Sequence, residues 1–229
     1  MLFKQLFDIK SSTYTYIVSS GKGREALIID PVIDNTDEYI NVLKNLDLKL
    51  VKVIDTHIHA DHVSGLNELS KRTRCSKIMG EHSRSEVLDI RVKDNEKIKI
   101  ENIELISIYT PGHTDCSYSF LMNDKVFTGD TLLINGTGRT DFQNGNALDQ
   151  YESIFKKLLK LPEKTLVYPA HDYKGKKYST IRDEKNNNPR LQVTSSEEYI
   201  KIMNNLKLDD PKMMNIAITA NKRGITLDQ

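Results

Sequence analysis

The chain has 229 residues, of which 33 are basic and 32 acidic, and it contains two cysteines, Cys75 and Cys116. The balanced charge excludes the strongly basic composition typical of nucleic-acid-binding proteins and gives no electrostatic reason for binding to a membrane. Two cysteines are too few for a disulfide scaffold. No secretory signal, transit peptide or membrane-spanning stretch is recognisable, so we expect a cytoplasmic protein.

Short apolar runs rich in β-branched and aromatic residues predict strands, and apolar residues spaced three or four positions apart predict helices. In chain order, we expect strands within the first thirty residues, including 14–18 and 26–29, then at 50–54, 78–80, twice within 91–110, and at 117–122, 125–128 and 165–168. The expected helices are 35–46, 61–73, 148–161 and 195–206. We predict one domain over residues 1–229, with 172–229 as a short, mainly helical extension packed on it.

The loop after the strand at 50–54 carries an unusual density of metal-binding side chains, namely His57, His59, Asp61 and His62. In extended backbone, residues two apart face the same side, so His57 and His59 can converge on one ion. Imidazole and carboxylate together suit zinc, iron and similar metals. An alternative role as loop caps is disfavoured, because so many buried ionisable groups would be costly without a common partner.

Three further candidate ligands each follow a later predicted strand: His113 in PGHT, Asp130 in TGDT and His171 in PAHD. The seven groups therefore occupy four strand ends, the positions at which open α/β layers usually carry their chemistry. They suit two metal ions with Asp130 between them, or one ion with the remaining groups hydrogen-bonded around it. The spacing leaves both alternatives open.

A glycine-rich polar loop, 135–145, separates Asp130 from the next helix and contains Arg139. Its length suits the rim of an active site, and the alternative is a mobile surface loop. Cys116 lies three residues after His113, where we expect an ordinary buried thiol, because nothing nearby in the sequence would lower its pKa.

The motifs THIHADHVSG, PGHT, FTGDTL and YPAHD resemble those of the metallo-β-lactamase superfamily. The resemblance implies an α/β fold, an αβ/βα sandwich of two mixed sheets flanked by helices. The segments GRTDFQNG, STIRDEKNNNPRL and IAITANKRG are further similar to the persulfide dioxygenase family, over residues 1–224. One departure is that Asp115 and Cys116 follow PGHT where this family often has Pro-Gly, which adds a charge near His113.

This resemblance implies an oxidoreductase of sulfide oxidation with one Fe(II) per chain, held by His57, His113 and Asp130. Such a set leaves coordination positions open for dioxygen and substrate. The side chains of His59, Asp61, His62 and His171 would then orient these ligands. Glutathione persulfide would be oxidised by O2 to sulfite with release of glutathione. Arg139 matches the arginine of the family loop and would help to hold the glutathione end, either directly or by ordering the loop through an acid such as Asp141. Tyr173, next to the His171 motif, is a second candidate.

Other functions would use the same residues. A dinuclear zinc hydrolase of the glyoxalase II type, cleaving a glutathione thioester, would need every ligand present here, but the GRTDFQ loop and the short segment after His171 fit the dioxygenase better. A β-lactamase usually has a cysteine ligand, which no candidate position provides. A non-enzymatic metal- or partner-binding relic would have lost ligands. The oligomeric state is open, with a homodimer as one alternative.

Overall fold

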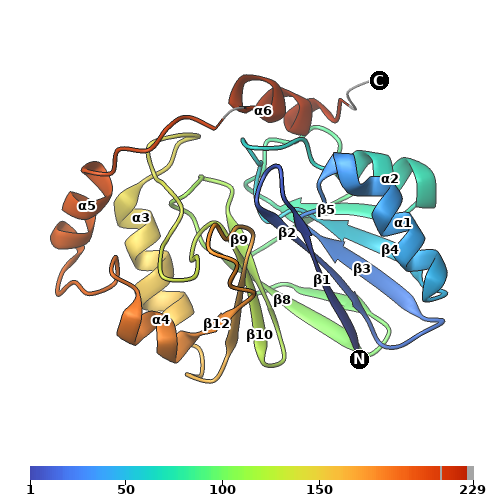
Figure 1. Cartoon of the computed structure of the whole chain (residues 1–229), viewed down its shortest axis with the longest axis horizontal. Helices are drawn as coiled ribbons and strands as arrows, with labels where there is room; N and C mark the ends of the chain where they lie inside the picture. Colours follow the sequence, from blue (N-terminus) through green and yellow to red (C-terminus); the bar gives the residue numbers. More distant parts are fainter. Residues whose placement is uncertain (212, 226–229) are drawn as a thin grey trace.

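The computed structural model describes residues 1–211 and 213–225, and two six-stranded sheets form its centre (Figure 1). The first sheet has the order β1-β2-β3-β4-β5-β6, formed by Leu2–Asp8, Thr13–Ser19, Glu25–Ile29, Lys49–Ile54, Ser76–Gly80 and Ile90–Val92. The second sheet has the order β12-β11-β10-β9-β8-β7. Its strands, from β7 to β12, are Lys97–Ile100, Ile103–Tyr109, Tyr118–Met122, Lys125–Gly129, Leu166–Pro169 and Ser179–Thr180.

Both sheets are mixed. Strands β3 to β6 pair in parallel, as do β10 and β11, and the remaining neighbours pair antiparallel. The carboxyl ends of β3 and β4 therefore lie side by side at one edge of the first sheet, and those of β10 and β11 at one edge of the second.

The two sheets pack face to face over one apolar core. Successive side chains of a strand point to opposite faces, so alternate residues of the central strands enter this core. Its members include Tyr16 and Val18 of β2, Leu27 and Ile29 of β3, Phe120 and Met122 of β9, and Phe127 of β10.

Helices cover the outer face of each sheet (Figure 1). The 3₁₀ turn η1 (Ile33–Asn35) leads into α1 (Thr36–Asn45), which lies with α2 (Leu66–Thr73) over the first sheet. The second sheet is covered by α3 (Ala147–Glu152), α4 (Ile181–Asn187) and α5 (Ser196–Asn204). The predicted αβ/βα sandwich is confirmed.

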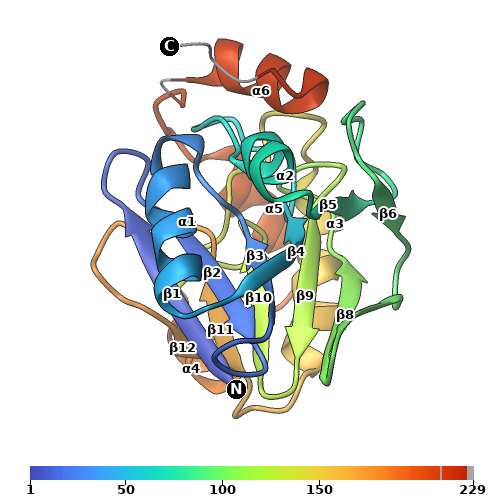
Figure 2. The same cartoon turned by 90° about the vertical axis from the view of Figure 1, so that its right-hand side faces the viewer.

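The last helix, α6 (Met214–Arg223), belongs to neither outer layer. Both views show it lying across one end of the molecule (Figure 1, Figure 2). There it packs on Val63, in the loop that joins β4 to α2, through Ala217 and Ala220.

Most predicted elements occur where the sequence pattern indicated them, but the helix predicted at 61–73 begins only at Leu66. The prediction for 61–65 was wrong because the carbonyl of His62 and the N–H of Ser64 bind the side chain of Asn221 instead of forming a helical turn.

The helix predicted at 148–161 changes geometry along its length. It is an α-helix only to Glu152, continues as a π-helical segment η2 (Ser153–Lys157) and ends as a 3₁₀ turn η3 (Leu158–Lys160). The sequence pattern gave no prediction for the short strands β6 and β12, for the polar helix α4 or for α6.

Beyond β11 the described chain is mainly helical, with α4, α5 and α6 following the two-residue strand β12. The predicted extension 172–229 ends with residues 226–229, which lie outside the described part, as does residue 212. Its assignment to a single domain with the rest stays a prediction. None of the described helices combines the length and apolar character that a membrane-spanning segment needs.

Candidate metal centre and active site

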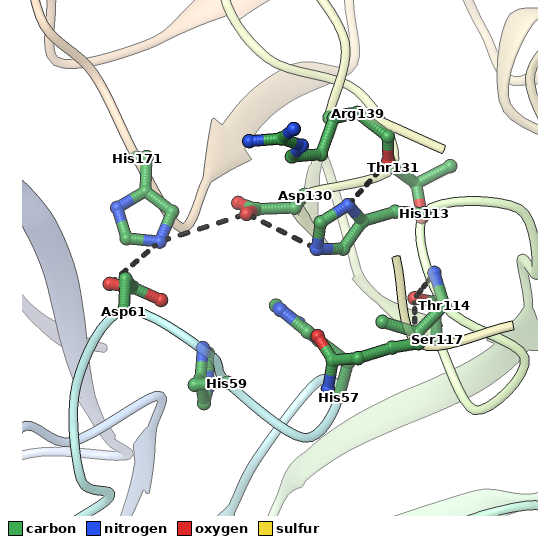
Figure 3. Close-up of polar contacts among 12 residues, drawn as sticks. His57, His59, Asp61, His113, Thr114, Ser117, Asp130, Thr131, Arg139 and His171 are labelled. Carbon is green, nitrogen blue, oxygen red and sulfur yellow. Dashed lines mark hydrogen bonds and ion pairs between the residues drawn. The ribbon is translucent and has the colours of Figure 1, made fainter. Parts of the chain in front are cut away.

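The seven predicted ligands lie together at one end of the two sheets, although they come from four separate segments. Figure 3 labels all of them except His62. The segments are the loop after β4, the turn after β8, the end of β10 and the end of β11. Because these strands end at facing edges of the sandwich, residues distant in sequence meet across it. The structure thus brings together every residue that the sequence marked as a candidate ligand.

The ligand atoms fall into two groups. Those of His57, His113 and Asp130 lie within 4.8 Å of one another, and those of the second group, His59, Asp61, His62 and His171, do so as well. Asp130 lies between the groups, with Oδ2 3.6 Å from His113 Nε2 and 3.7 Å from His171 Nε2. The first group coincides with the facial triad that the family resemblance implied, but the spacing still suits one ion or two.

Both histidines of the first group form a hydrogen bond through Nδ1, and this bond determines the tautomer of each ring. The Arg139 carbonyl, which can only accept, lies 2.7 Å from His113 Nδ1, so this nitrogen carries the proton. Thr56 Oγ1 donates to the Asp30 carboxylate and therefore accepts from His57 Nδ1 at 3.0 Å. In the neutral form of either ring, Nε2 is then the nitrogen that carries the lone pair, and that of His113 lies 3.6 Å from Asp130 Oδ2.

The second group is held in the same way. His59 Nε2 donates to Asp30 Oδ1 at 3.2 Å, and His62 Nδ1 donates to Asp61 Oδ2 at 2.8 Å. The backbone carbonyl of Ser12 accepts from His171 Nδ1 at 3.2 Å. In each ring the nitrogen opposite this bond faces the cluster.

The arrangement fits a metal ion. Asp130 Oδ1, His59 Nδ1 and His62 Nε2 are buried and have no hydrogen-bond partner among the described residues. Buried polar atoms are almost always paired, so such a concentration calls for a further binding partner. Imidazole lone pairs and a carboxylate facing one space are the donor set that zinc and iron take.

The two histidines after β4 differ in charge. Burial, reinforced by His59 and His113, lowers the pKa of the His57 ring far below its usual value. Burial also acts to lower the pKa of His59, but the hydrogen bond to Asp30 and the charges of Asp30 and Asp55 outweigh it and raise the pKa. Burial therefore favours the neutral form of the His57 ring, whereas Asp30 and Asp55 favour the protonated form of His59.

A cavity of about 450 Å³ opens beside the cluster, and His113, Asp130 and His171 form part of its wall. Three cationic residues also line it, Arg139, Lys174 and Arg190. The half-buried Arg190 donates through Nη1 to the carbonyl and hydroxyl of Thr137 and forms no ion pair with any described acid. Its remaining N–H groups can therefore bind an anionic ligand.

Arg190 was not among the predicted binding residues. The NPRL segment that contains it was noted only as a mark of the family. The predicted Tyr173 does line the cavity, with 73% of its surface exposed and its ring parallel to that of His171 at 6.1 Å.

The guanidinium of Arg139 also lines the cavity, but it is largely engaged elsewhere. It pairs with both oxygens of Asp141 at 2.6 and 2.7 Å, and donates to the carbonyl of Asp209. The Phe142 ring lies 4.1 Å from its central carbon. This geometry favours the alternative in which Arg139 pins its own loop, and its predicted contact with a substrate stays a prediction.

Gly138 lets that loop approach the cluster closely. A Cβ at this position would lie 2.2 Å from the Asp130 carbonyl and 2.8 Å from His113 Nδ1. Any larger residue would push the Arg139 carbonyl away from the imidazole that it orients.

Comparison with known proteins agrees with this geometry. The model of the metallo-beta-lactamase superfamily matches residues 9–171. Persulfide dioxygenase ETHE1 of Mus musculus is 41% identical over 226 residues, which cover 97% of this chain and 88% of the mouse protein. The chain belongs to the persulfide dioxygenase family. The predicted family is confirmed.

The crystal structure of ETHE1 from Myxococcus xanthus matches this member of the persulfide dioxygenase family with a TM-score of 0.95 and 44% identity, covering 97% of this chain and 98% of that one. A hydroxyacylglutathione hydrolase of Dictyostelium discoideum is more distant, at 30% identity over 195 residues, 80% of this chain and 71% of that protein. The similarity is therefore stronger to the dioxygenases than to the hydrolase.

Asp30 is the main residue of the site that the sequence analysis missed. It is buried and binds the Thr56 N–H at 2.7 Å, in addition to the Thr56 hydroxyl and His59. The available signal was its place at the end of β3, since an acid that ends a strand next to a ligand-bearing strand lies beside the ligands.

We expect Asp30→Asn to weaken metal binding by roughly ten- to a hundred-fold, the usual effect of losing a group that orients ligands. The amide must turn an NH2 group toward either Thr56 or His59, which are both donors to Asp30. Metal retention against a competing chelator measures the effect. Asp34→Asn, at an exposed acid that pairs with Lys10, is the matched control. Equal retention in the two variants would contradict the assigned role of Asp30.

Proposed function

We propose that this member of the persulfide dioxygenase family is an Fe(II)-dependent enzyme that oxidises glutathione persulfide with dioxygen. The observation that carries the proposal is the convergence of His57, His113 and Asp130, two imidazoles and one carboxylate, at the wall of the cavity. Support also comes from 41% identity to a protein named as a persulfide dioxygenase.

Iron held by such a triad would supply electrons and open coordination positions for oxidation of the substrate. In the overall reaction, glutathione persulfide, O2 and water give glutathione, sulfite and two protons. The S–S bond breaks, the outer sulfur loses four electrons, and O2 gains four. The inner sulfur leaves as the thiol of glutathione.

The cavity provides charge for the rest of the substrate. Glutathione carries two carboxylates and one amine, so its net charge is negative. Arg190 presents unpaired N–H groups to the cavity and Lys174 lies at its exposed side, which favours an anion there. Tyr173 offers a ring at the rim beside His171.

A dinuclear zinc hydrolase that cleaves a glutathione thioester is the second candidate. The second group, His59, Asp61, His62 and His171, favours it because its atoms also lie within 4.8 Å of one another. The weaker similarity to the hydrolase favours the dioxygenase. The cellular compartment and a homodimer both stay predictions.

The metal distinguishes the two candidates. Protein produced with iron and zinc both available should contain about one iron per chain. It should consume oxygen on addition of glutathione persulfide, stop when a chelator removes the metal and recover with Fe(II). Two tightly bound zinc ions per chain, with thioester hydrolysis and no oxygen uptake, would refute the proposal.

The two groups of ligands should respond differently to mutation. Replacement of His57, His113 or Asp130 by Ala should remove most of the iron and nearly all activity. His59→Ala and His171→Ala should keep more iron, with affinity or rate lowered roughly ten- to a hundred-fold. Metal analysis and oxygen uptake measure both effects. A similar loss of metal in all five variants would point to a dinuclear site.

The two arginines of the cavity should separate substrate binding from loop stability. Arg190→Ala should raise KM and lower kcat/KM by roughly ten- to a hundred-fold, the loss of one charge-assisted bond, while iron content stays constant. Arg139→Ala should instead lower the melting temperature and iron content, because its ion pair with Asp141 holds the loop behind His113.

A conservative variant serves as the control for Arg190, and the alanine variant itself decides the role of Arg139. Arg190→Lys keeps the charge but loses paired hydrogen bonding, so it should restore part of the affinity. If Arg139→Ala changes KM alone, at constant iron content and melting temperature, Arg139 contacts the substrate as the family resemblance implied.

A further inference from the structure

The tail motif Ala220-Asn221-x-x-Gly224 marked the family in the sequence, but no part of the proposed reaction uses it. The structure places it at the end of α6, over the loop between β4 and α2. That loop carries His59, Asp61 and His62. The motif therefore lies behind the second group of candidate ligands and outside the cavity, which it does not line.

The side chain of Asn221 binds three backbone groups of this loop. Its Nδ2 donates to the carbonyls of His59 and His62 at 2.9 and 3.0 Å, and its Oδ1 accepts from the Ser64 N–H at 2.8 Å. Only one orientation of the amide satisfies all three bonds, because the reverse would direct its oxygen at two carbonyls. An asparagine therefore matches this loop, whereas the equally shaped aspartate does not.

The rest of the motif brings Asn221 into place. Ala217 and Ala220 are small enough for α6 to approach Val63 of the loop. Gly224 ends the helix with a φ of +67°, and a Cβ there would lie 2.0 Å from the Asn67 side chain that binds its carbonyl.

The carbonyls at the end of the helix find partners in a second loop. Ser85 donates through its hydroxyl to the Asn221 carbonyl, and the Glu86 N–H donates to that of Lys222. The end of α6 is thus held by the segment around Ser85 as well as by the His59 loop, and the half-buried Asn221 side chain forms three hydrogen bonds with that loop.

We propose that Asn221 is a positioning residue that fixes the backbone of the His59–Ser64 loop and, through it, the direction of the His59 and His62 side chains. In this way α6 contributes to the site, although it belongs to neither outer layer of helices. The triad residues His113 and Asp130 lie on other segments and do not depend on it. Its effect on turnover rests on the proposed function, whereas its effect on the histidine rings does not.

Asn221→Asp is the sharpest test, since it keeps the shape, removes both donors and directs a charge at two carbonyls. Asn221→Ala removes the bonds without the charge and serves if the first variant does not fold. The matched control is Asn67→Ala, which removes a side-chain bond to α6 at Gly224 but none to the histidine loop.

The first readout is the set of side-chain ¹⁵N signals of the six histidines in the metal-free full chain. We expect the signals of His59 and His62 to move in both Asn221 variants, with those of His113 and His82 unchanged, and no such movement in Asn67→Ala. Unchanged His59 and His62 signals would overturn the proposal, and so would equal movement in the control, because general loosening of α6 would then explain it.

The second readout is steady-state kinetics on glutathione persulfide together with iron content. We expect kcat to fall roughly ten- to a hundred-fold, with KM nearly constant and most iron retained. Wild-type kcat in both Asn221 variants would overturn the proposal. If wild-type protein itself shows no oxygen uptake, the proposed function fails, while the histidine signals still decide the role of Asn221.

Discussion

The carboxylate of Asp30 is buried beneath the loop after β4 and accepts hydrogen bonds from Thr56 and His59. Because an ionised carboxylate can only accept, it determines the direction of each bond, including the one that Thr56 receives from His57. The direction of these bonds determines which ring nitrogen of His57 and of His59 faces the ligand cluster. Asp30 itself has a φ of +50°, a left-handed conformation that turns the chain sharply at the end of β3 and that Asp tolerates better than most residues.

Hydrogen bonds also orient the histidines that follow strands of the second sheet, but there the acceptors are backbone carbonyls instead of the Asp30 carboxylate. The Arg139 carbonyl orients His113 and the Ser12 carbonyl orients His171. Rings fixed in this way direct lone pairs at one space from several sides, which is unfavourable unless a cation lies between them. The loops that supply these carbonyls are therefore part of the site, even where their side chains point elsewhere. Arg139 illustrates this, since its guanidinium holds Asp141 while its carbonyl holds the imidazole.

Charges added near the site are neutralised locally. Asp115, which departs from the family pattern, binds Arg84 at 3.0 Å and the side-chain amide of Asn144 at 2.8 Å. The thiol of Cys116 is buried, and burial raises its pKa, as expected for an unreactive cysteine. Arg190 differs from these groups because it forms no ion pair with a described residue, which makes it available to a ligand.

The sequence by itself determined the ends of the main strands and the seven candidate ligands, because apolar periodicity and His/Asp spacing are local properties of the chain. The sandwich was predicted only through the resemblance of its motifs to the metallo-β-lactamase superfamily. It could not assign Asp30, Arg190 or Asn221, whose roles depend on residues far away in sequence. Asn221 lies 162 positions from His59, whose carbonyl it binds, and its bonds to the His62 carbonyl and the Ser64 N–H explain why the predicted helix starts late. Only the tertiary structure decided which nitrogen of each histidine faces the centre, since that choice depends on acceptors that the fold brings behind each ring.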